Sequence, residues 1–315
     1  MLRTDVHQHL WSEPLVEALA RRSRPPFIRR NGHVWELTVP GEALSTIDVV
    51  GDEIPTRGAL VHLDGLDVAV LSLSSVLGVE GLIRDEAADV IAGYEAGVRG
   101  LPDSFAAWGA LPLRDAEPAD AERVLAAGFA GLSLPAGAIV SPSGLERVGP
   151  LLEVAQRRAA PVFVHPGPDP FAPQAPAGAD GPSWFPALTE YVALMNAAWH
   201  SFVAVGRKLL PDLRVVFAML AGGAPLHLER LAARGGPGAR AFDRNLYYDT
   251  SSYGERAIDA MVRVVGIDQL LHGSDRPVVA PPAPPGPLGA AAWEAMTRTN
   301  PARLFPTRAR TAVAA

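Results

Sequence analysis

The stretch DVHQHL at residues 5–10 sets two histidines, His7 and His9, one residue apart in a run that is typical of a β-strand. Alternate residues of a strand point to the same face, so both imidazoles face one side of the sheet. Two imidazoles in a packed interior are costly unless something satisfies them, and a divalent cation does so with neutral nitrogen ligands. The alternative is a polar strand at the protein surface.

Seven further apolar, β-branched runs follow this one, and longer helical patterns separate them. The expected strands are 4–10, 67–74, 105–111, 131–134, 161–165, 214–218, 246–250 and 270–273. The expected helices are 84–99, 117–127, 144–158, 188–210, 225–234 and 255–265. Eight alternations of strand and helix predict an α/β fold of the (β/α)8 TIM barrel type, and a doubly wound sheet is the second choice.

Three segments are longer than a plain barrel needs, and we interpret them as insertions in a single domain of residues 1–315. The first, about 27–60, contains a hairpin signal around Asn31-Gly32 that favours a type I′ turn. The second, 166–186, holds seven prolines, and the third, 277–287, holds six. All three follow expected strands, so they should lie on the face of the barrel where TIM-barrel enzymes carry their active sites. Ordinary surface loops are the alternative.

Two more strands end in residues that ligate metals. The run VFVHP at 162–166 ends the fifth strand in His165, and HGSDRP at 272–277 ends the eighth in Asp275. Strand ends at the C-terminal face of a barrel converge on one site. His7, His9, His165 and Asp275 are therefore four candidate ligands of one divalent metal. A loop-capping role for His165 and a turn-forming role for Asp275 are the alternatives.

Composition excludes several classes of chemistry. Acidic residues outnumber basic ones, 34 to 28, and no dense basic stretch suggests a nucleic-acid partner. Cysteine is absent, which excludes disulfides and thiolate chemistry, and Lys208 is the only lysine, which argues against Schiff-base catalysis. No signal peptide or membrane span is expected, so we predict a cytoplasmic protein whose partner is a small-molecule substrate; a homodimer stays open.

The sequence resembles the amidohydrolase superfamily, in particular the amidohydrolase-related proteins of the aminocarboxymuconate-semialdehyde decarboxylase type. The metal motifs are His7-x-His9, His165 and GSDRP at 273–277, and the supporting segments are DGLD at 64–67, GFAG at 128–131, YDTS at 248–251 and NPARLF at 300–305. The resemblance implies a distorted (β/α)8 barrel that holds a divalent metal, usually zinc and sometimes manganese. It also implies hydrolysis of C–N or C–O bonds, or removal of carboxylate from aromatic and related acids.

Two positions depart from the family pattern. The fourth strand, GLSL at 131–134, lacks the lysine that bridges two metals in some members, so one metal is implied. Met219 stands where the family has a histidine before a Gly-rich turn, and a thioether cannot act as a base. Among the remaining histidines, His200 is the best placed to replace it.

The favoured function is that of a metal-dependent hydrolase in which Asp275 takes the proton of a metal-activated water and a small lactone, ester or amide is cleaved. The alternative is a non-oxidative decarboxylase of an aromatic or related acid, and the third hypothesis is a catalytically weakened metal-binding protein. Candidate substrate contacts are Arg276, which could pair with a carboxylate, the loop tryptophans Trp11 and Trp184, and Met219 as an apolar wall.

Overall fold

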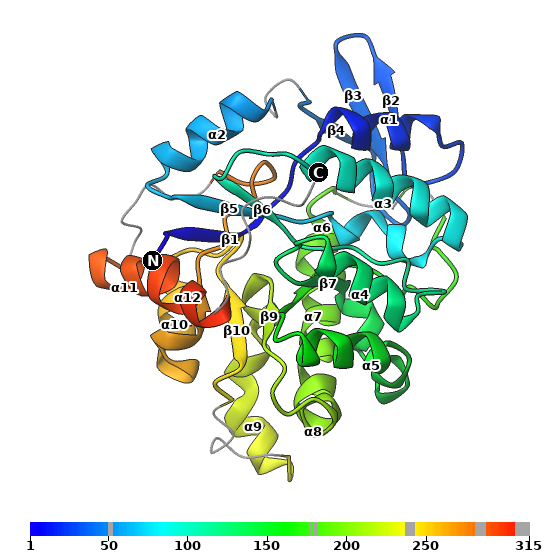
Figure 1. Ribbon diagram of the computed structural model, residues 1–315. Helices are drawn as coiled ribbons and strands as arrows, with labels where there is room; N and C mark the ends of the chain where they lie inside the picture. The colour runs from blue at the N-terminus through cyan, green and yellow to red at the C-terminus, as the bar shows by residue number, and fades with distance from the viewer. Residues whose placement is uncertain (50–52, 177, 179–181, 237–242, 281–287, 306–315) are drawn as a thin grey trace.

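Eight parallel strands form the centre of the computed structural model (Figure 1), which describes residues 1–49, 53–176, 178, 182–236, 243–280 and 288–305. They are β1 (Thr4–Gln8), β5 (Val68–Leu71), β6 (Phe105–Ala107), β7 (Leu132–Pro135), β8 (Val162–His165), β9 (Val215–Phe217), β10 (Leu246–Asp249) and β11 (Leu270–Leu271). Each overlaps a strand expected from the sequence. Their residues are buried throughout, as strands covered on both faces require.

The strands run around the barrel in chain order. Ladders join them into two sheets, β1-β5-β6 and β11-β10-β9-β8-β7. At one junction Val6 N donates to His272 O at 2.9 Å and Asp275 N to His7 O at 2.9 Å. At the other junction an isolated bridge pairs Gly109 with Leu132. The barrel is therefore distorted and incompletely laddered, and its sequential strand order rules out the doubly wound alternative.

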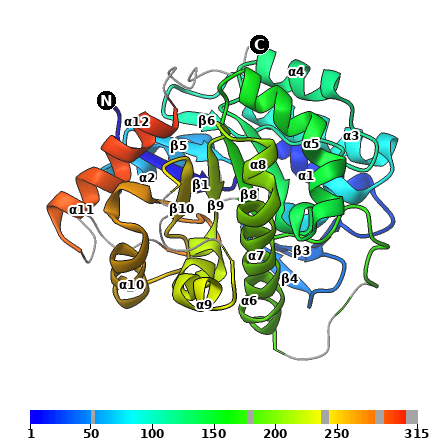
Figure 2. The ribbon, with the colours of Figure 1, turned by 90° about the horizontal axis from the view of Figure 1, so that it is seen from below.

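Helices lie outside the strands and surround them (Figure 2). They are α1 (Glu13–Arg21), α2 (Ile54–Leu63), α3 (Arg84–Val98), α4 (Pro118–Ala126), α5 (Pro142–Arg157), α6 (Phe185–Leu188), α7 (Glu190–Ser201), α8 (Arg207–Leu209), α9 (Leu228–Ala233), α10 (Glu255–Val265), α11 (Ala290–Glu294) and α12 (Asn300–Leu304). The helix expected over 188–210 is broken at Thr189 and contains a π-helical turn at Phe202–Gly206. No helix of the described residues is both long and apolar enough to cross a membrane.

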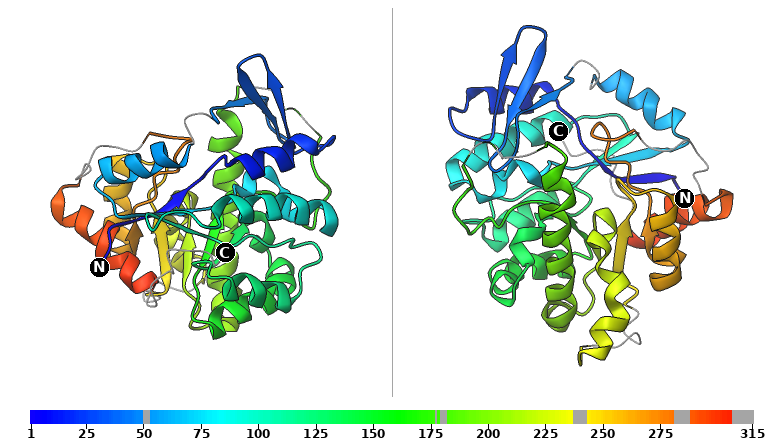
Figure 3. Two further views of the ribbon diagram at one scale, coloured as in Figure 1. Left: turned by 45° about the horizontal axis from the view of Figure 1, so that its top comes forward. Right: turned by 180° about the vertical axis from the view of Figure 1, so that it is seen from behind.

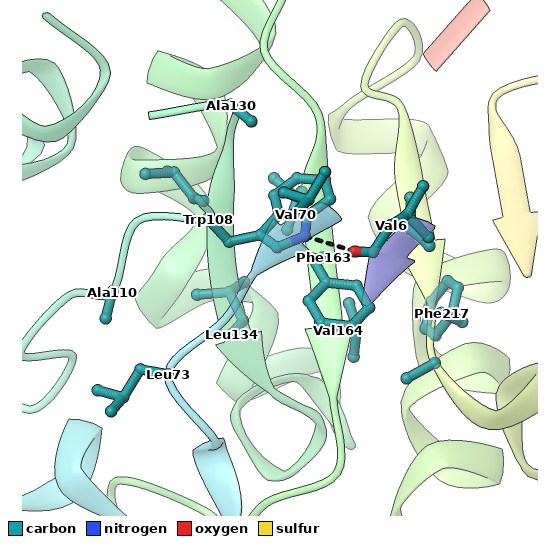
Figure 4. Packing of buried hydrophobic residues seen from close by; sticks show 14 of the residues in the cluster. Val6, Val70, Leu73, Trp108, Ala110, Ala130, Leu134, Phe163, Val164 and Phe217 are labelled. Atoms are coloured by element: carbon teal, nitrogen blue, oxygen red, sulfur yellow. Dashed lines mark hydrogen bonds between the residues drawn. The ribbon is translucent and has the colours of Figure 1, made fainter. Parts of the chain in front are cut away.

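The core of the barrel contains Trp108, a fully buried residue that follows β6 (Figure 4). Its indole Nε1 donates a hydrogen bond of 2.9 Å to the carbonyl of Val6 on β1. Its ring stacks on Phe163 of β8, with 5.2 Å between the ring centroids. One side chain therefore ties together three strands, two of which carry candidate metal ligands.

The first insertion forms a small antiparallel sheet beside the barrel mouth, made of β2 (Phe27–Asn31), β3 (Val34–Thr38) and β4 (Ser45–Ile47) (Figure 3). The hairpin turn is shifted by one residue from the expected Asn31-Gly32, because Asn31 pairs with Val34 and the turn is Gly32-His33. Gly32 has φ +60°, which suits the glycine at the first central position of a type II′ turn.

The Pro-rich loop after β8 contacts this sheet. Gly41 N, between β3 and β4, donates to Pro176 O at 2.8 Å. The expectation that the first two insertions meet over one mouth agrees with this contact. Residues 281–287 of the third expected insertion lie outside the described residues, as do 50–52, 177 and 179–181 of the other two.

The opposite end of the barrel carries Lys208. This residue is exposed on α8, directly before the segment that enters the N-terminal end of β9. The metal-ligand candidates lie at the C-terminal ends of the strands, so Lys208 lies at the far end from them.

We expect Trp108→Phe to lower the free energy of unfolding by about 1–3 kcal/mol, because the Val6 carbonyl loses a buried hydrogen-bond donor while most of the ring contact remains. Urea unfolding followed by circular dichroism measures the change. Trp184→Phe is the matched control, since Trp184 is 59% exposed and should change stability by less than about 0.5 kcal/mol. Equal effects of the two substitutions would contradict this account of Trp108.

Candidate metal centre

The structure brings His7, His9, His165 and Asp275 together, with one ligand atom of each lying within 4.8 Å of all the others. His7 comes from β1, His9 follows it, His165 ends β8 and Asp275 lies beyond β11. The three histidines are buried and Asp275 keeps 16% of its side chain exposed. The cluster is thus reachable from the barrel mouth at its carboxylate side.

Each histidine is held through its Nδ1 atom. His7 Nδ1 lies 2.7 Å from Oδ2 of Asp249 on β10, His9 Nδ1 lies 2.8 Å from the Ser72 carbonyl, and His165 Nδ1 lies 2.7 Å from the Pro166 carbonyl. A carbonyl or an ionised carboxylate only accepts, so Nδ1 carries the proton in all three rings. The three Nε2 atoms are therefore the free ligand positions.

The Nε2 atoms of His7 and His9 carry lone pairs that repel each other, and a proton or a metal ion between them would remove this repulsion. His7 Nε2 and His9 Nε2 are only 3.2 Å apart, and they lie 3.4 and 3.2 Å from Oδ1 of Asp275. Four atoms at about 2.0–2.1 Å from a tetrahedral ion are separated by about 3.3 Å. The spacing of the His7, His9 and Asp275 atoms, and the donor set of three nitrogens and one oxygen, fit a divalent cation such as Zn²⁺ or Mn²⁺.

Without a cation, a proton supplies that charge. Burial lowers the pKa of His7, but the carboxylates of Asp249 and Asp275 outweigh burial and raise it to about 9. Burial and the neighbouring His7 and His9 hold the pKa of His165 well below its ordinary value. Burial raises the pKa of Asp275, whereas His7 and His9 lower it, and the net direction is down. The cluster thus favours an ionised Asp275 and carries one proton that a cation would displace.

Asp249 links the centre to the loop that holds Met219. Its Oδ1 accepts hydrogen bonds from Ser251 N at 3.0 Å, Ser251 Oγ at 2.6 Å and Met219 N at 3.0 Å, while its Oδ2 accepts from His7. The sequence analysis did not predict this hydrogen bond between Asp249 and His7. Gly273 makes room for it, because a Cβ at this position would lie 2.9 Å from the Asp249 carboxyl carbon.

Met219 begins a run of left-handed backbone. Residues 219–223 all have φ between +50° and +75°, and three of these residues are not glycine. Each such residue costs roughly 1–2 kcal/mol. The hydrogen bond from Met219 N to Asp249 helps to hold the loop in this form. Met219 therefore contributes through its backbone, which the expectation of an apolar wall did not anticipate.

The other expected substrate contacts are placed differently from the prediction. The Arg276 guanidinium forms a two-pronged ion pair with Asp64, at 2.9 and 3.0 Å, so its carboxylate partner belongs to the chain itself. Trp184 is 59% exposed and contacts Phe185, so it does not act as a pocket wall in this structure. Trp11 is partly buried and packs against the core.

The remaining histidines do not join the cluster formed by the described residues. His200 lies against Trp199 on α7 with its ring centroid 4.9 Å from the indole, and its pKa is lowered by burial and by His227. His272 is buried against Trp293 and lies 3.8 Å from Asp5. Neither His200 nor His272 is therefore a metal-ligand candidate of the cluster formed by the described residues.

Comparison with known proteins gives a family and a fold. The model of the family described as Amidohydrolase matches residues 4–307. A search of curated proteins finds no match. The solved IDCase of Metarhizium anisopliae has a TM-score of 0.72 at 17% identity, over 96% of this chain and 97% of that chain.

Two decarboxylase structures are similar to the chain. The 5-carboxyvanillate decarboxylase of Novosphingobium aromaticivorans, complexed with manganese and 4-hydroxy-3-methoxy-5-nitrobenzoic acid, has a TM-score of 0.71 at 16% identity, over 97% of this chain and 96% of that chain. The 2,6-dihydroxybenzoate decarboxylase of Rhizobium has a TM-score of 0.67 at 18% identity, over 96% and 98%. At these identities the likeness shows a shared fold.

We expect His7→Ala and His165→Ala to lose most of the bound metal, since each removes one of three nitrogen ligands. The measurement is metal content per chain by inductively coupled plasma mass spectrometry after purification and desalting. His272→Ala is the control, because it removes a buried histidine outside the cluster and should keep the wild-type content. Stoichiometric metal in both ligand variants would show that the assignment is wrong.

Asp249→Asn should weaken metal affinity by about 10–100-fold while leaving the fold intact, because the amide keeps the shape of the carboxylate but not its charge toward His7. Competition with a chromophoric chelator measures the affinity. A matched substitution, Asp243→Asn, removes a carboxylate that pairs with Arg207 and should leave metal affinity unchanged. An unchanged affinity in Asp249→Asn would contradict the role given to this hydrogen bond.

Proposed function

Because the chain belongs to the amidohydrolase family, we propose that it is a metal-dependent carboxy-lyase acting on a small aromatic or related acid. The observation that carries the proposal is the cluster of three free Nε2 atoms and one carboxylate at the barrel mouth, in a fold shared with solved decarboxylases. Hydrolysis, the function favoured from the sequence, is less well supported than the decarboxylase alternative.

Two observations favour the lyase. Similar structures include the two named decarboxylases, one complexed with manganese and a substituted benzoic acid. In addition, Met219 stands where the family has a histidine, so a hydrolase would have to rely on Asp275 alone as the base for water. Removal of carboxylate requires instead one group that can return a proton to carbon, which Asp275 can supply.

One divalent cation would be held by His7, His9, His165 and Asp275. Three nitrogen donors and one oxygen donor suit zinc or manganese. When bound, the cation would draw charge from the substrate carboxylate and a neighbouring oxygen. Asp249, Ser72 and Pro166 keep the three imidazoles oriented through Nδ1. Phe163, whose ring lies 4.9 Å from that of His7, gives the site an apolar floor.

The reaction breaks the bond between carbon and carboxylate, and the electron pair stays on the carbon as CO₂ leaves. A proton must then form the new C–H bond. Asp275 is the partly exposed carboxyl of the cluster, so it can take a proton from solvent or from a substrate hydroxyl and pass it to that carbon. Carboxylate is thereby replaced by hydrogen, with no oxidant or reductant.

We expect protein reloaded with Zn²⁺ or Mn²⁺ to release CO₂ from at least one hydroxylated aromatic acid, and not to hydrolyse lactones, esters or amides. Asp275→Asn should lower kcat by about 10²–10⁴-fold, as the loss of general acid–base help does. Met219→Leu should stay within about threefold of wild type, since its side chain takes no part in the chemistry. A bicarbonate-coupled assay and a pH-indicator assay for hydrolysis measure the two reactions.

Hydrolysis without CO₂ release would overturn the lyase in favour of the hydrolase. Bound metal without either reaction would instead favour the third hypothesis, a catalytically weakened metal-binding protein. Near-full activity of Asp275→Asn would remove Asp275 from the mechanism whichever reaction is found.

A further inference from the structure

A cavity of about 260 Å³ opens on the same face of the barrel as the metal centre. Its walls come from the turn between β3 and β4, the segment after β5, the end of β7, the loop after β8 and the first turns of α7. Pro135, one of its lining residues, pairs with His165 in the β7–β8 ladder, and Gly167 lies two residues beyond His165. The cavity therefore begins beside a candidate metal ligand.

The charged residues that line this cavity are all acidic. Glu42, Glu80, Asp169 and Glu190 line it, and none of its described lining residues is Arg, Lys or His. Glu42 accepts a hydrogen bond from the Tyr191 hydroxyl, which joins the first insertion to α7. An anionic group in the cavity would meet four acidic side chains and no counter-charge.

Among these four acidic residues, Glu80 has a buried carboxylate oxygen without a hydrogen-bond partner among the described residues. It is 1% exposed, and its Oε1 accepts a hydrogen bond of 2.5 Å from Ser75 Oγ. Its Oε2 is buried and has no hydrogen-bond partner among the described residues. Leaving a buried carboxyl oxygen unpaired costs about 1–3 kcal/mol or more, so a donor supplied by a ligand would be stabilised here. Burial raises the pKa of Glu80, as expected for a carboxyl without a nearby cation.

We propose that this cavity binds a protonated or N–H-bearing nitrogen of the substrate, with Glu80 as the residue that accepts its hydrogen bond. The substrate class is then an acid that carries an amino or similar nitrogen group as well as its carboxylate, and dicarboxylic acids are disfavoured. Only the placement of the carboxylate at the metal centre rests on the proposed lyase function.

The test uses three probes of similar size, benzylamine, benzyl alcohol and benzoate, on the metal-free wild-type chain. Ligand-observed NMR titration at pH 7 should give a Kd for benzylamine at least tenfold below that for benzyl alcohol, and benzoate should not displace benzylamine. Equal binding of amine and alcohol, displacement by benzoate, or no benzylamine binding would each overturn the proposal.

Variants test the assigned residue. Glu80→Gln should raise the Kd for benzylamine at least tenfold, because the amide keeps an oxygen that accepts from Ser75 but places an N–H donor where Oε2 would accept. Glu146→Gln makes the same change at an exposed position of α5 and should have no effect. Should Glu80→Gln fail to melt cooperatively, Glu42→Gln reports on the same cavity with an expected loss of at least threefold. An unchanged Kd in a folded Glu80→Gln or Glu42→Gln variant would refute the assignment.

The titration needs neither metal nor turnover, so its result is separable from that of the lyase assay. Selective benzylamine binding by a chain that releases no CO₂ would overturn the lyase and support the cavity assignment. CO₂ release by a chain that binds benzylamine no better than benzyl alcohol would do the reverse.

Discussion

The hydrogen bonds that fix the three histidine rings through Nδ1 are the constraint on which the centre depends. They turn three Nε2 atoms toward one point, where His7 and His9 nitrogens lie 3.2 Å apart. That arrangement is unfavourable unless a proton or a metal ion lies between the rings. The buried Asp249 carboxylate and two backbone carbonyls hold the rings in this arrangement through hydrogen bonds. A bound cation would remove the unfavourable contact between the Nε2 atoms, so the protein is arranged in advance for metal binding.

The strands and the meeting of His7, His9, His165 and Asp275 were predictable because each follows from local sequence patterns. Short β-branched runs gave the eight strands, and alternation along β1 placed His7 and His9 on one face. The strand ends at His165 and Asp275 then followed from the barrel topology. The hairpin turn was missed by one residue because both Asn31-Gly32 and Gly32-His33 suit a two-residue turn, and the pairing of Asn31 with Val34 decides between them.

Features that depend on distant residues were not accessible from the sequence. Arg276 is 212 positions from Asp64, and nothing near either residue indicates that they form an ion pair. The cavity is likewise assembled from five separated segments, and Glu80 stands in none of the motifs. The left-handed run at residues 219–223 was hidden because Met, Leu and Ala rarely adopt this conformation. The structure shows that Met219 N donates hydrogen bonds to Asp249 Oδ1 and Ser251 Oγ, which hold the start of this run in place.

The position of Lys208 has a practical consequence. An amine-reactive linker that couples to lysine side chains finds one such group in the chain, exposed on α8 at the N-terminal end of the barrel. Molecules immobilised through the Lys208 side chain would therefore all be attached at the same point and share one orientation. The tethered molecules would present the His7–Asp275 mouth to the flowing solution and keep the linker away from it.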